Sequence, residues 1–237
     1  MSNNYSTSAS HYIPSVINAT LLNMTSPAVG NTKSPYNVAQ ITALSITFTL
    51  VIAISVAGNA MVILAIAIDR DLKRPQYYLI LSLGVADLMV GLAVMPLAAL
   101  YEIQRQRWIL GERGCDLWIS LDVLSCTASI LHLVAIALDR YWTITNIHYS
   151  QERTVKRIGI MISVIWAVAL VISIAPILGW KDASFTERIQ VWKKCLISQD
   201  FAYQVFSTSA AFYVPLMAIL ILYWKIFKVN GSKYVNN

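Results

Sequence analysis

The chain has 237 residues, of which 57% are hydrophobic and only 13% are charged. This composition excludes an ordinary soluble domain, in which about 25% of residues are charged, and is typical of a membrane protein. The formal net charge of +6 is modest and spread between the predicted loops, so it gives little support to nucleic-acid binding. The histidines and cysteines form neither a catalytic set nor a cluster with metal-ligand spacing. We therefore expect no enzyme and no metal site.

Residues 1–39 are rich in Ser, Thr and Asn and lack the charged start and early apolar core of a signal peptide. They predict a disordered tail. Three glycosylation sequons lie in it, at Asn4, Asn18 and Asn23. The tail carries a single basic residue, Lys33, whereas three lie between residues 70 and 74. Because basic residues favour the cytoplasmic face, we expect the N-terminus outside and the C-terminus in the cytoplasm.

Five apolar runs are each long enough to cross a bilayer as a helix. They cover residues 41–68, 77–101, 117–138, 158–178 and 203–227. The sequence therefore predicts an all-α membrane protein. Residues 40–228 form its transmembrane region, and residues 229–237 form a short cytoplasmic tail.

The first two runs contain polar residues that need partners inside the membrane. Asn59 follows Gly58, and we expect an interhelical hydrogen bond at a point of close helix approach. Asp87 lies near the middle of the second run, where a carboxylate should be protonated, ion-bound or hydrogen-bonded. Pro96 should kink the same helix, because it removes a backbone hydrogen bond.

The third run has an aspartate near each end, Asp122 and Asp139, roughly 25 Å apart along a helix. A charge at a helix centre in the membrane costs at least about 2.5 kcal/mol, so Asp122 should meet a cationic partner. Asp122, Cys126 and Ser129 share one helix face. Asp139 precedes Arg140, and the residues alone favour a local ion pair at the membrane interface.

The predicted topology places Cys115 and Cys195 on the outer side, in an oxidising compartment, so we expect a disulfide between them. Cys126 lies in mid-helix, where a buried apolar thiol is the simpler interpretation. Ser207 and Thr208 lie in the outer half of the fifth run, and their simplest interpretation is hydrogen bonding to preceding carbonyls.

Motifs at fixed spacings turn these observations into a family resemblance. In chain order they are Gly58-Asn59, LGVAD at 83–87, Trp108, Cys115, Asp139-Arg140-Tyr141, Trp166, Cys195, Pro215 and Tyr223. Together they resemble the rhodopsin-like (class A) G-protein-coupled receptors, and within them the biogenic amine group, over about residues 40–228. The run SILHLVAIALDRYW, with the polar positions of the fifth helix, is most similar to serotonin receptors of types 1 and 7. The WKIF stretch and the second outer loop look more like invertebrate members.

The resemblance implies a plasma-membrane receptor for serotonin or a closely related amine. Such a receptor transmits agonist binding to a heterotrimeric G protein, and the type 1 likeness implies the inhibitory kind. Asp122 would pair with the ligand's ammonium group, and Ser207 and Thr208 would contact its ring end. The other implied pocket residues are Val123, Cys126, Thr127, Ala211 and Phe212.

Two further sets of residues follow from the resemblance. Activation and G-protein contact would involve Asp139, Arg140, Tyr141 and Tyr223. Asn59, Asp87 and Ser129 would form the polar cluster linked to sodium, which would act as an allosteric modulator in a chain with no other expected cofactor.

After Phe227 the chain shows no sixth or seventh apolar helix, so we expect a receptor truncated after the fifth helix. One alternative is therefore a non-signalling isoform or fragment that associates with full-length receptors or is retained in the endoplasmic reticulum. A proton-linked transporter would also explain Asp87 and Asp122, but the sequence has no internal repeat.

Overall fold

The structure is a computed structural model that describes residues 37–69, 74–146, 149 and 154–235, with side chains up to residue 229. The predicted tail up to residue 36, including the sequons at Asn4, Asn18 and Asn23, lies outside the described residues. All packing below concerns Ile41–Asn237.

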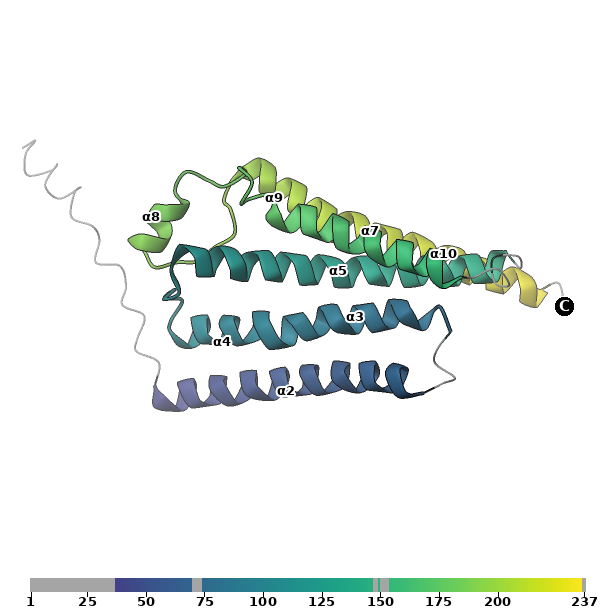
Figure 1. Cartoon of the computed structure of the whole chain (residues 1–237), viewed down its shortest axis with the longest axis horizontal. Coiled ribbons are helices and arrows are strands. Elements are labelled where there is room, and N and C mark those ends of the chain that lie inside the picture. Colours follow the sequence, from purple (N-terminus) through teal and green to yellow (C-terminus); the bar gives the residue numbers. More distant parts are fainter. Residues whose placement is uncertain (1–36, 70–73, 147–148, 150–153, 236–237) are drawn as a thin grey trace, which may run out of the picture. The chain divides into compact units, whose positions relative to one another are not determined.

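The described residues contain five helical spans that are long and apolar enough to cross a membrane, as predicted. The first, third and fourth spans are α2 (Val38–Ile68), α5 (Gly111–Thr145) and α7 (Val155–Ile174) (Figure 1). The second joins α3 (Tyr77–Met89), η1 (Val90–Val94) and α4 (Met95–Ile103). The fifth joins α9 (Phe201–Thr208), η2 (Ser209–Tyr213) and α10 (Val214–Val235). The chain is therefore an all-α, multi-pass membrane protein.

Helix α5 occupies the middle of the bundle, because it packs against α3, α7 and α10 (Figure 1). Its contact positions include the buried alanines Ala128 and Ala135, which let neighbouring backbones approach closely. Leu79 from α3 and Ile158 from α7 fill the same core cluster. The packing of α5 against these helices fixes the positions of the side chains along its whole length relative to α3, α7 and α10.

Helix α2 packs closely against the second span at two glycines of the second span, Gly84 and Gly91. The glycine of α2 itself, Gly58, is not part of this contact. A Cβ atom added to Gly91 would lie 2.9 Å from the Val56 side chain, and one added to Gly84 would lie 3.1 Å from Ile63. By contrast, nothing in the described structure lies within 4 Å of a Cβ at Gly58. The predicted close approach at Gly58 is therefore wrong.

The two π-helical segments each precede a proline. Pro96 and Pro215 lack the N–H that would bond the carbonyl four residues earlier, and those carbonyls belong to Leu92 in η1 and Ala211 in η2. A π-helical turn accommodates such a lost bond and changes the direction of the side chains that follow. The distortion predicted at Pro96 thus lies one turn earlier, in η1.

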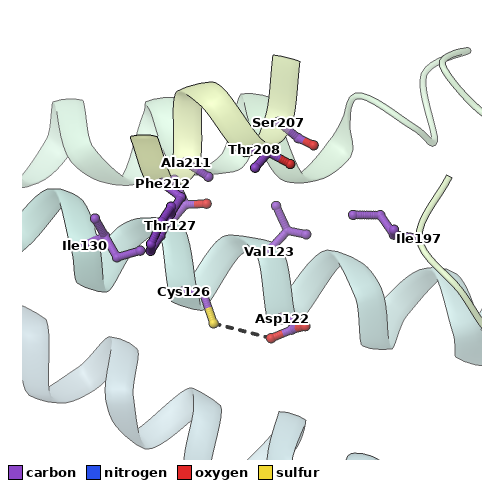
Figure 2. A pocket seen from close by; sticks show the side chains of 10 residues that line it. All are labelled: Asp122, Val123, Cys126, Thr127, Ile130, Ile197, Ser207, Thr208, Ala211 and Phe212. Carbon is purple, nitrogen blue, oxygen red and sulfur yellow. Dashed lines mark hydrogen bonds between the residues drawn. The ribbon is translucent and has the colours of Figure 1, made fainter. Parts of the chain in front are cut away.

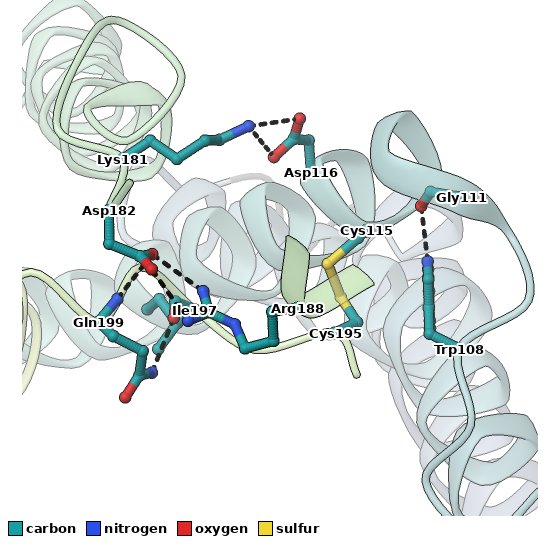
Figure 3. The surroundings of a disulfide bond; sticks show 10 residues. All are labelled: Trp108, Gly111, Cys115, Asp116, Lys181, Asp182, Arg188, Cys195, Ile197 and Gln199. Atoms are coloured by element: carbon teal, nitrogen blue, oxygen red, sulfur yellow. Dashed lines mark hydrogen bonds and ion pairs between the residues drawn. A yellow bond between two sulfur atoms is a disulfide. The ribbon is translucent and has the colours of Figure 1, made fainter. Parts of the chain in front are cut away.

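We name the two ends of the helix bundle after residues near the two ends of α5. The disulfide end contains Cys115, and the Asp139 end contains Asp139. At the disulfide end, Cys115 and Cys195 form the predicted disulfide (Figure 3). Trp108 is buried beside it, and its backbone N–H donates to the Lys193 carbonyl (2.6 Å). The loop of residues 175–200, which we call the disulfide loop, is therefore fastened to the first residues of α5. It contains a short helix, α8 (Phe185–Gln190), that the sequence did not predict.

Candidate functional site

A pocket of about 290 Å³ lies between α5, the α9–η2 segment and the disulfide loop (Figure 2). The structure brings all eight residues predicted to bind ligand to this one pocket. Two residues that the sequence did not predict, Ile130 and Ile197, complete the lining. The lining residues are Asp122, Val123, Cys126, Thr127, Ile130, Ile197, Ser207, Thr208, Ala211 and Phe212.

The α5 wall of the pocket carries its negative charge. Asp122 Oδ1 accepts a hydrogen bond from Cys126 Sγ at 3.3 Å, one turn further along the helix. Figure 2 shows both side chains on one side of α5, whereas Val123 and Thr127 project towards η2. No lining residue is basic. The Asp122 carboxylate thus lines the pocket from the edge of α5, and no described lining residue is a cation.

Cys126 is exposed in the structure, so the predicted buried thiol is wrong. The reason is that Cys126 follows Asp122 by one helical turn and shares its face, which points away from the α9–η2 segment and so is not packed against it. Since Cys115 and Cys195 are joined, Cys126 is the single free thiol of the 237-residue sequence.

The opposite wall carries hydroxyl groups. Ser207 Oγ donates to the Gln204 carbonyl at 3.3 Å, which confirms the bond predicted to a preceding carbonyl.

Thr127 on α5 is buried, and its Oγ1 has no hydrogen-bond partner among the described residues. A buried hydroxyl without a partner costs about 1–3 kcal/mol, so a ligand that bonds Thr127 Oγ1 gains by satisfying it.

The positions of the two lining residues that were not predicted, Ile130 and Ile197, can be explained from helix periodicity and from the disulfide. Ile130 follows Thr127 by three residues and so lies on the same face of α5. Ile197 follows Cys195 by two residues, and the disulfide holds that segment of the loop against α5. Helical periodicity could have identified Ile130, and the predicted disulfide could have pointed to residues beside Cys195.

A network of charges holds the disulfide loop in place (Figure 3). Both Arg188 terminal nitrogens donate to the Asp182 carboxylate at 2.9 Å, and the Gln199 backbone N–H donates to Asp182 Oδ1 at 3.1 Å. The Arg188 hydrogen bonds hold the pKa of Asp182 well below its usual range, against a smaller opposing effect of burial. Lys181 forms an ion pair with Asp116 of α5 at 2.7 Å. The loop is thus tied to α5 by charge as well as by the disulfide.

The predicted sodium-linked cluster is only partly assembled. Ser129 Oγ donates to Asp87 Oδ1 at 2.7 Å, which joins α5 to α3. Asn59 Nδ2 donates to the Ser55 carbonyl at 3.0 Å, within its own helix, so the predicted interhelical bond is wrong. Helix α2 can satisfy the amide locally, because Ser55 lies one turn earlier on the same face. Asp87 and Ser129 place two side-chain oxygens side by side, and no group of three acidic, His or Cys side chains that could hold a metal ion is found in the described residues.

At the Asp139 end, a tyrosine missed by the sequence analysis contacts the acid. Asp139 is 2% exposed, and its Oδ1 accepts a hydrogen bond from Tyr149 Oη at 2.9 Å. Arg140, by contrast, is exposed. The Lys225 ammonium lies 5.9 Å from the Tyr141 ring, and Tyr223 is exposed on α10. Tyr141 therefore approaches α10, whereas Asp139 contacts Tyr149.

His132 is a second missed residue, at the centre of a buried polar network. Its Nε2 lies 2.8 Å from Ser82 Oγ, and Trp166 Nε1 donates to the same oxygen at 3.0 Å. Its Nδ1 lies 2.7 Å from the Ala128 carbonyl. The contacts join α3, α5 and α7, which gives His132 a structural role.

The fold and the pocket define a class: a multi-pass helical membrane protein with an acid-bearing pocket between its helices. The family model "7 transmembrane receptor (rhodopsin family)" matches residues 58–233, and the chain belongs to that family. This finding confirms the resemblance drawn from the motifs.

Three relatives with about half of their aligned residues identical are named as 5-hydroxytryptamine receptors. The chain is 50% identical over 200 residues to "5-hydroxytryptamine receptor" of Bombyx mori, covering 84% of this chain and 45% of that one. It is 58% identical over 171 residues to "5-hydroxytryptamine receptor" of Heliothis virescens, covering 72% and 36%. It is 51% identical over 175 residues to "5-hydroxytryptamine receptor 1A-alpha" of Takifugu rubripes, covering 73% and 40%. The chain thus spans less than half the length of these relatives.

Proposed function

We propose that the chain belongs to a plasma-membrane receptor that binds serotonin or a closely related amine and transmits binding to a heterotrimeric G protein of the inhibitory type. The observation that carries the proposal is the pocket itself. Asp122 is its single acidic lining residue, and none of the lining residues is basic. The names of the relatives support serotonin as the amine.

The proposed binding mode follows from the two walls. The ligand's ammonium pairs with the Asp122 carboxylate, because burying either charge alone is strongly unfavourable. The ring lies among apolar side chains and reaches the hydroxyl groups of Thr127, Ser207 and Thr208. Ala211 offers no hydroxyl, so this wall suits an indole with one ring hydroxyl better than a ring with two.

For transmission, we propose that α5 couples the pocket to the Asp139 end. Tyr149 holds Asp139 in the resting state, and Arg140, Tyr141 and Tyr223 form part of the G-protein contact. Sodium is proposed as a modulator held by Asp87 and Ser129.

The test is saturation binding of radiolabelled serotonin to membranes of cells that express the receptor from its genomic locus. Asp122→Asn should weaken binding by at least about 100-fold, because it leaves the ammonium without a buried counter-charge. Asp116→Asn is the matched control, since Asp116 lies on the same helix but pairs with Lys181. Affinity unchanged by Asp122→Asn would refute the amine site.

A second candidate role is association with another receptor chain. Helix α2 exposes large apolar side chains along its length, including Ile46, Ile54 and Met61. Helix faces of this kind can pack against a second helix within a bilayer. Co-precipitation of the chain with a full-length receptor would support this role, and prompt degradation without association would refute it.

A further inference from the structure

A groove with entirely apolar walls runs along the surface between α5 and α7, away from the amine pocket. It has a volume of about 310 Å³. Its walls include Leu131, Val134 and Leu138 of α5 and Ile160, Val164 and Val168 of α7. Ile160 and Val164 remain 57% and 55% exposed. The groove therefore offers an apolar ligand more contact than a flat helix face does.

A cation lies at one end of this groove. Arg157 precedes Ile160 by one helical turn, and Trp142 follows Leu138 by one turn on the same face of α5. The Arg157 guanidinium lies 5.4 Å from the Trp142 ring centroid and 4.6 Å from that of Tyr149. These aromatic contacts occupy the face of the guanidinium, so its N–H edge is left to bond a phosphate. Lys156 adds a second exposed basic side chain beside it.

The distance from Arg157 to the far end of the groove matches one leaflet of a bilayer. From Arg157 to Val168 the helix rises roughly 16 Å, and one leaflet contributes about 15 Å of hydrocarbon. An acyl chain that fills the groove therefore places its headgroup at Arg157. The basic end selects an anionic headgroup over a zwitterionic one, since each basic residue near an anionic surface favours it.

We propose that this groove binds an anionic phospholipid, with one acyl chain between α5 and α7 and the headgroup phosphate at Arg157. The site is separate from the amine pocket and does not depend on the proposed function. It links the Asp139 end of α5 to membrane lipid through Arg157, which contacts Trp142 and Tyr149.

The test uses the purified full chain in nanodiscs of equal phosphatidylserine and phosphatidylcholine, with retained lipids counted by native mass spectrometry. Nanodiscs carry both lipids in both leaflets, so the result is independent of topology. The chain should retain phosphatidylserine over phosphatidylcholine by about fivefold, and Arg157→Gln should remove that preference. Lys228→Gln is the matched control, because Lys228 lies over the Trp224 ring at 5.6 Å on another helix. It should leave the preference intact.

A second pair of variants tests the groove itself. Val164→Phe should lower retention of both lipids by filling the groove, whereas Val171→Phe, at an exposed position of the same helix outside it, should not. Equal retention of the two lipids, an equal effect of Lys228→Gln and Arg157→Gln, or no effect of Val164→Phe would each overturn the proposal. If Arg157→Gln fails to fold by circular dichroism, the Val164→Phe comparison decides, since an exposed position tolerates the change.

Discussion

The acidic side chains of the membrane-spanning helices differ in what satisfies them. Asp87 accepts a hydrogen bond from Ser129 on a neighbouring helix, and Asp139 accepts one from Tyr149. Asp122 receives its described bond from the weak thiol donor of Cys126. Because a thiol satisfies a carboxylate poorly, Asp122 is the acid best placed to gain from a cationic ligand.

At the same scale, Ser129 should contribute to the stability of the bundle. Ser129→Ala removes the described donor to Asp87, and an unsatisfied buried acceptor costs about 1–3 kcal/mol. Thermal unfolding of the detergent-solubilised chain should therefore occur at a lower temperature. Ser163→Ala is the control, because Ser163 is exposed and donates to its own helix at Gly159. Equal unfolding temperatures for the two variants would contradict the assignment.

Among the elements, the five helical spans and a distortion near Pro96 could be predicted from the sequence, whereas the π-helical form of the distortions could not. Apolar runs predicted all five spans, but polar ends such as Gly111–Asp116 hid the true start of α5. The form of the π-helical segments depends on which groups donate hydrogen bonds to the backbone carbonyls near Pro96 and Pro215, and these donors can be distant in the sequence. Trp118, for example, donates to the Val94 carbonyl at 3.2 Å. No periodicity in the sequence records that contact.

For the site too, some residues could be predicted from the sequence and others could not. The eight residues that the resemblance assigned to ligand binding line one pocket, because they recur at helical spacing on α5 and the fifth span. Ile197 was missed, because its position depends on the fold of the disulfide loop. Tyr149 was missed, because it lies ten residues from Asp139, beyond the spacings that bring side chains together on one helix. Contacts between separate segments are set by tertiary structure rather than by local pattern.

The disulfide loop should lose order in acid. The folded pKa of Asp182 is depressed, so its stabilising contribution is complete above its unfolded pKa of about 3.9 and is lost as the pH falls towards the folded value. The protection factors of the α8 amides, which compare their hydrogen exchange with that of an unfolded chain at the same pH, should therefore fall below about pH 4. In Asp182→Asn the protection factors should be lower already at neutral pH, with little further acid response. Protection factors that do not change with acid in the wild-type chain would contradict the role of the Asp182–Arg188 pair.

For the whole molecule, the predicted topology gives the N-terminus an outer location. Glycans attach only in the lumen, so the tail sequons should be used when the chain is expressed in cells. Treatment with an N-glycosidase should increase electrophoretic mobility, and replacement of Asn4, Asn18 and Asn23 by Gln should abolish that change. An unchanged mobility, together with protection of the tail from protease in intact cells, would place the N-terminus inside.

The pocket at Asp122 is proposed to bind an amine, and a cysteine beside the carboxylate can report that event. Cys126 is the single free thiol and lies 3.3 Å from the Asp122 carboxylate. A bound ammonium ligand should therefore cover it.

The most direct measurement is the rate at which 2-aminoethyl methanethiosulfonate labels Cys126 in the purified chain, with and without serotonin. At ten times its dissociation constant, serotonin should slow labelling by about tenfold. 3-Ethylindole, which lacks the ammonium, should give no protection, and serotonin should give none in Asp122→Asn. Labelling of the wild-type chain at the same rate with and without serotonin would contradict the account.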